Sequence, residues 1–234
     1  NSMKLAIMQP YFFPYIGYFQ LINMIDKFVI YDNIQYTKKG WINRNRFLVN
    51  GRDSFFSIDL KKDSDYLNIC DRKLAVSFNR KRLINKLRGA YCKAPFYNNI
   101  FPVVKNIINY NTDRLFDYIL YSLEMICNLL SIDFNKVIIS SSIEINHTLK
   151  SEDKILAIGD KLNAQQYINP IGGIDLYNED SFTNVGLELR FLKSNMISYT
   201  QFRNEFVPCL SIIDVLMFNS LKEVKEMLNN YEII

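Results

Sequence analysis

The sequence predicts an α/β fold with a mainly parallel sheet, a mainly helical insertion and a helical C-terminus. Short apolar runs with the length of buried strands alternate with segments of helical periodicity. The 234 residues are 49% hydrophobic, which is enough for a substantial core. No internal repeat or low-complexity linker divides the chain. We therefore expect one domain over residues 3–234, with the helical insertion at residues 79–131.

The N-terminal segment has the pattern of a βαβ unit. The apolar run 5–8 stops at Gln9-Pro10, because proline cannot donate to a ladder. Apolar residues then recur at helical spacing, and a second apolar run covers residues 28–31. Two strands joined by a crossover helix are parallel, and ligands of open α/β sheets bind beyond the carboxyl ends of such strands. We therefore expect the active site in the loops after Met8 and Tyr31.

A hairpin and three helices are expected next. Asn50-Gly51 suits the turn of a hairpin between residues 46–49 and 54–58, and residues 69–78 are interpreted as a further short strand. Periodic apolar residues predict helices over residues 79–87, 103–108 and 114–130. The first of these is rich in arginine and lysine. Its basic residues are interpreted as a solvated surface rather than an anion site.

The second half of the chain has the pattern of another βαβ unit followed by C-terminal helices. We expect a third buried strand at residues 137–140, a helix capped by Ser151 that runs to about residue 162, and a strand at 166–170. Residues 187–191 alternate, which is typical of an edge or half-exposed strand. The last helices are expected over 210–218 and 221–231, with Ser220 as an N-cap.

Charge and cysteine content exclude several classes of function. The net charge of +4 without a run of five like charges argues against nucleic-acid binding, so no DNA partner is expected. Four widely spaced cysteines and one histidine, His147, predict no metal site and a reduced, cytoplasmic chain. No apolar stretch has the length of a transmembrane helix or the pattern of a signal peptide. Asn1 and Ser2, which precede Met3, are interpreted as a cloning remnant.

Polar residues crowd the loop after the second strand. Asp32 ends this strand and is a predicted general base or ammonium binder, with helix capping as the alternative. Residues 38–46 combine four cations with Trp41, which suits a phosphorylated ligand and a stacked ring; a basic surface loop anchored by Trp41 is the alternative. Gly172-Gly173 would let the backbone approach a phosphate or sugar, or form an ordinary turn, and Tyr177 would stack on a ring.

Several motifs together resemble the WbqC-like protein family. They are QPYFFPYIGYF, FVIYDNIQY, KKGWINRNR, INPIGGIDLY and FVPCLSIIDVLMFN, so the resemblance spans nearly the whole chain. The family occurs in bacterial surface-polysaccharide gene clusters. The resemblance implies transfer of glycine to the amino group of an amino sugar.

A remoter resemblance concerns Tyr15-Ile16-Gly17-Tyr18. This motif takes the place of His-x-Gly-His in nucleotidyltransferase-type Rossmann-like enzymes, such as pantothenate synthetase. The likeness implies a Rossmann-like sheet and makes ATP a candidate co-substrate. Both histidines are tyrosines here and no KMSKS-like segment follows, so cationic stabilisation would have to come from Lys38, Lys39 or Arg44.

Two functions follow from these patterns. The first is a transferase that attaches glycine or another small acyl group to the amine of a nucleotide-linked amino sugar, with Asp32, Lys38 and Arg44 as predicted catalytic residues. The alternative is a non-catalytic protein that binds a nucleotide or nucleotide sugar. The predicted ligand-binding residues are Gln9, Pro10, Tyr11, Tyr15, Gly17, Tyr18, Gln35, Trp41, Asn43, Asn45, Gly172, Gly173 and Tyr177.

Overall fold

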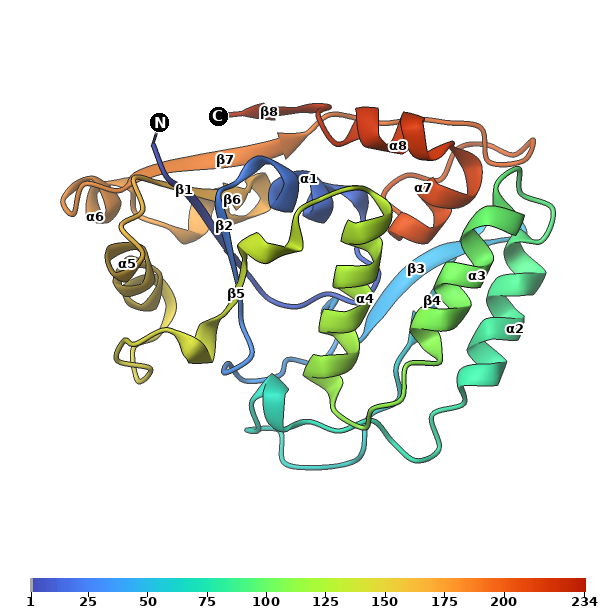
Figure 1. The fold of residues 1–234 in the computed structure, drawn as a ribbon, viewed down its shortest axis with the longest axis horizontal. Helices are drawn as coiled ribbons and strands as arrows, with labels where there is room; N and C mark the ends of the chain where they lie inside the picture. Colours follow the sequence, from blue (N-terminus) through green and yellow to red (C-terminus); the bar gives the residue numbers. More distant parts are fainter. Residues whose placement is uncertain (1) are drawn as a thin grey trace.

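A mixed sheet with helices on both faces organises the structure, a computed structural model that describes residues 2–234 (Figure 1). The interpretation of Asn1 as a cloning remnant lies outside these residues. The elements are β1 (Lys4–Met8), α1 (Ile16–Met24), β2 (Lys27–Ile30), β3 (Arg44–Val49), β4 (Arg52–Ser57), η1 (Ile69–Asp71), α2 (Arg80–Tyr91), α3 (Tyr97–Ile108), α4 (Leu115–Leu129), η2 (Phe134–Lys136), β5 (Val137–Ile139), η3 (Ser140–Ser142), α5 (Ser151–Lys161), β6 (Gln166–Pro170), η4 (Ile171–Leu176), α6 (Glu179–Thr183), β7 (Glu188–Ser194), α7 (Ile212–Phe218), α8 (Leu221–Met227) and β8 (Tyr231–Ile233).

The order of the strands confirms the predicted α/β, Rossmann-like fold. The sheet has the order β5-β2-β1-β6-β7-β8. Its first five members are parallel, and β8 runs antiparallel to β7. Counted in chain order, the parallel strands follow the 3-2-1-4-5 arrangement of Rossmann folds. The sheet therefore has its topological switch point between β1 and β6.

The two faces of the sheet are covered by different helices. Ala6 and Phe28 belong to the same core cluster as the buried residues of α1. Leu5, Ile7 and Val29 point to the other face and join the cluster that holds the buried isoleucines of α5. Because successive residues of a strand point to opposite faces, α1 and α5 lie on opposite sides of the sheet.

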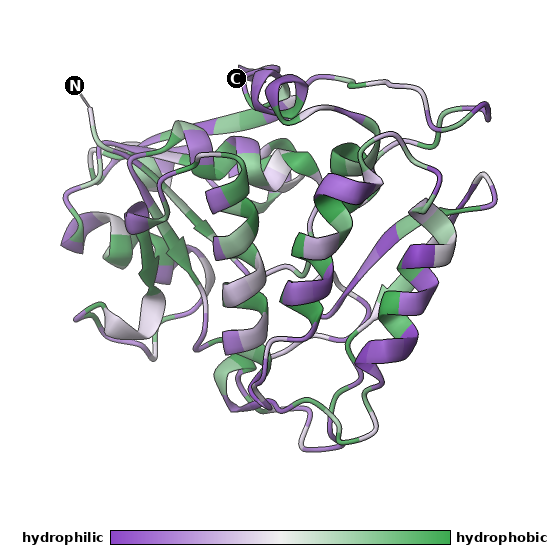
Figure 2. Cartoon of the chain, turned by 45° about the vertical axis from the view of Figure 1, so that its right-hand side comes forward, coloured by the Kyte–Doolittle hydropathy of each residue, from purple (hydrophilic) through white to green (hydrophobic). Residues whose placement is uncertain are grey.

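A second part of the molecule packs against the sheet. It contains the hairpin β3–β4 and helices α2, α3 and α4, on the right of Figure 1. Positive φ angles at Asn50 and Gly51 close the hairpin with the predicted two-residue turn. These helices carry hydrophobic and hydrophilic stripes in Figure 2, as expected for helices buried on one face. The assignment of residues 79–131 as an insertion within one domain stays a prediction.

No helix within residues 2–234 combines the length and the apolar character that a bilayer crossing requires.

Of two strand predictions, one was wrong about position and one was confirmed. The run 137–139, predicted as a buried strand, forms the sheet edge β5 and is only half-buried, since it pairs with β2 alone. The strand predicted at 187–191 as half-exposed or at an edge is half-exposed, and β8 covers only the C-terminal end of β7, residues 191–194. The prediction of helix up to residue 231 was also wrong. Helix α8 ends at Met227, and the next residues cover the edge that β7 would otherwise expose.

Three local predictions were also wrong. Residues 69–78 contain the turn η1 and isolated bridges rather than a strand. Helix α3 begins at Tyr97 and includes Pro102, because packing of its apolar face outweighs the lost hydrogen bond. Ser151 does not cap α5. It is the first residue of the helix with φ +51°, and no side chain caps the helix. Ser220, in contrast, forms the expected N-cap within a capping box.

A buried hydrogen-bond network joins the hairpin to α2 and α7. The Tyr91 hydroxyl accepts from the Leu48 amide at 3.0 Å and donates to Asp214 at 2.8 Å. Tyr199 and Gln201 donate to the other oxygen of Asp214. Burial raises the pKa of Asp214, and these three donors partly offset the rise. The network therefore holds the ionisable carboxyl group of Asp214 in the core. Loss of any of its hydrogen bonds would leave a buried polar atom without a partner.

We expect Tyr91→Phe to lower the free energy of unfolding by about 1–3 kcal/mol, because the buried Leu48 amide would lose its acceptor. Urea denaturation measures the change. Tyr97→Phe is the matched control, since the Tyr97 hydroxyl forms no hydrogen bond with residues 2–234. Equal unfolding free energies for both variants would contradict the assigned role of Tyr91.

Candidate functional site

Two cavities open where β1 and β6 end. Cavity one has a volume of about 330 Å³ and cavity two of about 860 Å³. Met8 lines the first and its neighbour Gln9 lines the second, as expected for successive residues that point to opposite faces of the sheet. The cavities therefore flank the topological switch point, the usual ligand position of open α/β sheets.

Cavity one is mostly aromatic and apolar. It is lined by Met8, Tyr11, Pro14, Tyr15, Gly17, Tyr18, Trp41, Asn45, Arg46, Pro170, Ile171, Gly172, Leu192, Ser194 and Cys209. Seven of the predicted ligand-binding residues are among them: Tyr11, Tyr15, Gly17, Tyr18, Trp41, Asn45 and Gly172. Trp41 is 37% exposed, so part of its ring stays accessible. Such a lining suits a flat or apolar ligand group held by few polar contacts.

Arg46 brings the charge to cavity one. Its guanidinium donates to the Cys209 carbonyl at 3.1 Å, pairs with Asp53 at 3.4 Å and lies 5.5 Å from the centre of the Trp41 ring. Its Nε is buried without a hydrogen-bond partner among residues 2–234, as is the Ser194 hydroxyl. Buried donors are rarely left unpaired, so both atoms keep hydrogen-bonding capacity beside the cavity.

The start of α1 adds further donors. Tyr15 occupies the N-cap position without a side-chain hydrogen bond, and the first turn has no acidic residue. Gly17 lies in this turn, and a Cβ there would come within 3.6 Å of the Tyr15 ring and 3.9 Å of Ser194. A side chain would therefore occupy space in cavity one. No side chain caps the first amides of the helix, although the Tyr18 amide donates to the Tyr15 carbonyl, and such a helix start favours an anion.

The two tyrosines that replace the histidines of the remote motif stay neutral. Burial raises the pKa of Tyr15, Cys209 adds to the rise, and the neighbouring Ser194 hydroxyl opposes it. Burial also raises the pKa of Tyr18 well above its usual value. The Tyr18 hydroxyl donates to the Gln9 carbonyl at 2.7 Å and thus holds the loop after β1. Neither tyrosine supplies positive charge.

The three predicted catalytic residues do not meet in either cavity. Asp32 is buried, and its Oδ1 accepts from the Ser140 hydroxyl at 3.1 Å and the Ser141 amide at 2.9 Å. The exposed Lys38 forms an ion pair with Asp65 at 2.9 Å. Arg44 donates to the Gly40 carbonyl at 3.0 Å and lies over the Phe55 ring at 4.7 Å.

The remaining predicted residues are divided. Gln9, Gln35 and Tyr177 line cavity two. Pro10, Asn43 and Gly173 line neither cavity. Asn43 is engaged instead with the Tyr36 hydroxyl at 2.8 Å and the Ile58 carbonyl at 3.0 Å, and Gly173 leaves no room for a Cβ beside the Asn169 amide.

Cavity two is larger and more polar. Besides the three predicted residues it is lined by Tyr31, Asn33, Ile34, Tyr66, Asn68, His147, Thr148, Leu149, Lys150, Ser151, Glu152, Lys154, Ile155 and Leu176. Both ring nitrogens of His147 are engaged, with Asn33 at 3.0 Å and with the Ile143 carbonyl at 2.8 Å. No three His, Cys, Asp or Glu residues within 2–234 are grouped to hold a metal ion.

Sequence reasoning missed Arg46 and Lys154 as site residues. Arg46 belonged to the basic run 38–46, but nothing in that run distinguishes the one cation that reaches the cavity from the three that do not. Lys154 lies in the first turn of α5 beside two acidic residues, which is an ordinary surface pattern. No sequence signal marks its burial.

Comparison with known proteins gives one short match. A segment of 43 residues is 56% identical to Uncharacterized protein Rv1507c of Mycobacterium tuberculosis (strain ATCC 25618 / H37Rv). This segment is 18% of the present chain and 19% of that protein, so the match spans less than a fifth of either. The comparison with solved structures gave no significant match.

The match to a protein family is much longer. The sequence pattern of the WbqC-like protein family covers residues 9–226, which include the lining of cavity two, all of the cavity-one lining except Met8, and the loops after β1, β2 and β6. Membership of this family is compatible with a role of the protein in polysaccharide biosynthesis. The chain belongs to the WbqC-like protein family.

Proposed function

We propose that this protein transfers glycine or another small acyl group to the amine of a nucleotide-linked amino sugar in bacterial surface-polysaccharide biosynthesis. The observation that carries the proposal is cavity one. It combines an unpaired buried guanidinium nitrogen, a buried hydroxyl and an uncapped helix start with accessible aromatic rings at the switch point. Membership of the WbqC-like family supports the pathway.

The nucleotide would lie in cavity one. Its phosphate oxygens would accept from Arg46 Nε and from the amides at the start of α1, and Trp41 would stack on a ring. ATP as an activating co-substrate would meet the same groups, since it carries the same phosphate and base chemistry. The neutral tyrosines Tyr15 and Tyr18 would contribute shape and hydrogen bonds but no charge.

The transfer itself needs a base and a stabilised oxyanion. The amine nitrogen attacks the carbonyl carbon of the activated acyl group, the bond from this carbon to the leaving group breaks, and the nitrogen loses one proton. Asp32 is the proposed base, because Oδ1 accepts both hydrogen bonds and Oδ2 accepts none from residues 2–234. Lys38 and Arg44 stay proposed oxyanion partners, although both would first have to leave Asp65 and Gly40.

A direct assay tests the reaction. The protein is incubated with glycine, a nucleotide-linked 4-amino sugar and either ATP or glycyl-tRNA, and the products are weighed by mass spectrometry. We expect an adduct heavier than the acceptor by one glycyl residue. No adduct with either donor would rule out glycine transfer.

The rival proposal is a binding protein without turnover. One observation favours it: Tyr18 uses its hydroxyl to hold the Gln9 carbonyl at 2.7 Å, so the second histidine position serves the loop and not a phosphate. The rival predicts that a nucleotide sugar raises the melting temperature while no product forms. The assay above and thermal denaturation together separate the two proposals.

We expect Arg46→Met to raise the Kd for a nucleotide sugar about tenfold or more, because a charge-assisted hydrogen bond is lost. Calorimetric titration measures it. Arg52→Met is the matched control, since Arg52 is exposed on the same hairpin and lines neither cavity. Equal affinities of the two variants would contradict the placement of the phosphates.

We expect Asp32→Asn to lower the rate of acyl transfer about 100-fold or more and to change the Kd of the nucleotide sugar less than twofold. The amide oxygen of asparagine can still accept from Ser140 and Ser141, so the local structure is kept, but the basic oxygen is removed. Asp59→Asn, at an exposed position, serves as the control. An unchanged rate would show that Asp32 is not the base.

A further inference from the structure

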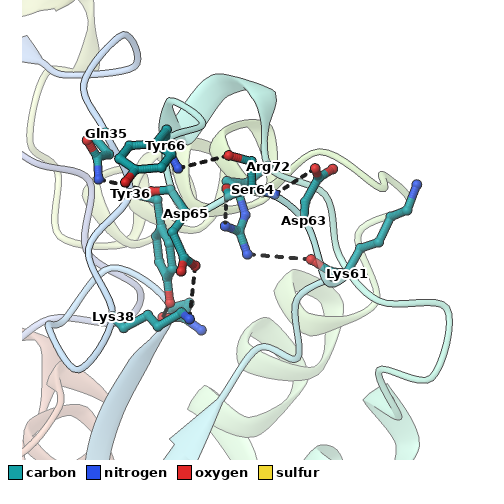
Figure 3. Close-up of polar contacts among 10 residues, drawn as sticks. Gln35, Tyr36, Lys38, Lys61, Asp63, Ser64, Asp65, Tyr66 and Arg72 are labelled. Carbon is teal, nitrogen blue, oxygen red and sulfur yellow. Dashed lines mark hydrogen bonds and ion pairs between the residues drawn. The ribbon is translucent and has the colours of Figure 1, made fainter.

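Tyr66, which lines cavity two, lies in a surface loop held by the polar contacts drawn in Figure 3. Tyr66 is 84% exposed, so core packing does not explain its place. Four contacts hold the loop: Arg72 donates to the carbonyls of Lys61 and Ser64 at 3.4 and 3.2 Å, Gln35 donates to the Asp65 carbonyl at 2.9 Å, and Lys38 pairs with the Asp65 carboxylate at 2.9 Å. The backbone that carries the exposed ring is therefore held in place before any ligand binds.

The rest of the lining suits a polyhydroxylated ring. Tyr31 and Tyr177 join Tyr66 as aromatic groups, each with an apolar face and a polar tip. Four amide side chains line the same cavity: Gln9, Asn33, Gln35 and Asn68. An amide both donates and accepts hydrogen bonds, and so does each hydroxyl of a sugar. Aromatic faces together with several amides therefore match the alternating apolar and polar surface of a pyranose.

A buried cation in this cavity has no ion-pair partner. Lys154 is 4% exposed, and its ammonium donates to Asn33 Oδ1 at 3.2 Å and lies 5.0 Å from the Tyr31 ring. No carboxylate of residues 2–234 comes within ion-pair distance of it, and the more distant Asp32 only partly opposes the lowering of the Lys154 pKa by burial. A buried charge without a partner is costly, and a bound oxyanion would supply both the charge and the missing hydrogen bonds.

The start of α5 lies beside this lysine. The helix has 11 residues, and no side chain caps its first amides. Ser151 and Lys150 line cavity two at this point, as does Glu152. The two lysines outnumber the glutamate, so the cavity keeps a positive excess next to the helix start. Both features favour an anion at the same place.

We propose that cavity two binds an anionic sugar. The pyranose lies against Tyr66 and Tyr177 and bonds to the amides, and its acidic substituent reaches Lys154 and the start of α5. The acid is a phosphate or a carboxylate, which share the oxyanion chemistry. The proposal goes beyond acyl transfer, because it concerns a separate cavity and can be measured as binding without turnover.

Calorimetric titration of the full chain tests the proposal with four probes: glucose 1-phosphate, glucuronate, glucose and inorganic phosphate. We expect one anionic sugar to bind at least about tenfold more tightly than both glucose and phosphate, and the probe that does so identifies the acid. Lys154→Met should weaken this binding about tenfold or more. Lys161→Met, an exposed position of the same helix, should leave it unchanged.

A second variant keeps the test independent of any effect of Lys154 on folding. Tyr66→Ala removes an exposed ring, and we expect it to weaken the anionic sugar about fivefold or more while phosphate binding stays the same. Phe55→Ala, an exposed ring outside both cavities, is its control.

Three outcomes would overturn the proposal: neither acid binds better than glucose, inorganic phosphate binds as tightly as the sugar phosphate, or binding survives both Lys154→Met and Tyr66→Ala. Arg46→Met alters cavity one only, so loss of nucleotide binding there leaves the result for cavity two unaffected.

Discussion

The pairing of β1 with β2 on one side and with β6 on the other is the constraint on which the site depends. Both neighbours are parallel to β1, so the loops after all three strands open at the same edge of the sheet. Helix α1 connects β1 to β2 on one face of the sheet, and α5 connects β5 to β6 on the other face. The two helices therefore start on opposite sides of that edge. The order of these strands thus creates two cavities, one on each face of the sheet edge.

The distribution of charge at this edge follows from burial. Two of the four cations in residues 38–46 hold this part of the chain: Lys38 pairs with Asp65, and Arg44 contacts backbone carbonyls and an aromatic face. Arg46 lines cavity one and Lys154 lines cavity two, each with hydrogen-bonding capacity left. With neutral tyrosines at the positions of the remote histidine motif, these two residues carry the electrostatics of our proposals.

The second part of the molecule contributes directly to the site. The hairpin β3–β4 carries Asn45 and Arg46 into cavity one, and the Tyr91–Asp214 network fixes that hairpin to α2 and α7. Arg72, which follows η1, holds the loop that presents Tyr66 to cavity two. Groups far apart in the sequence thus shape both cavities. A change in this packing would therefore alter the position of residues that line them.

The sequence by itself determined the fold class, the first βαβ unit and the hairpin, because periodicity, proline and Asn-Gly act locally. It also located the loops at the sheet edge, since parallel strands share that edge. Only the tertiary structure decided that β8 covers β7, that residues 137–139 lie at an edge, and that Arg46 and Lys154 rather than Lys38 and Arg44 line the cavities. Strand neighbours, burial and ion-pair partners depend on contacts between distant segments, and a local pattern carries no information about them.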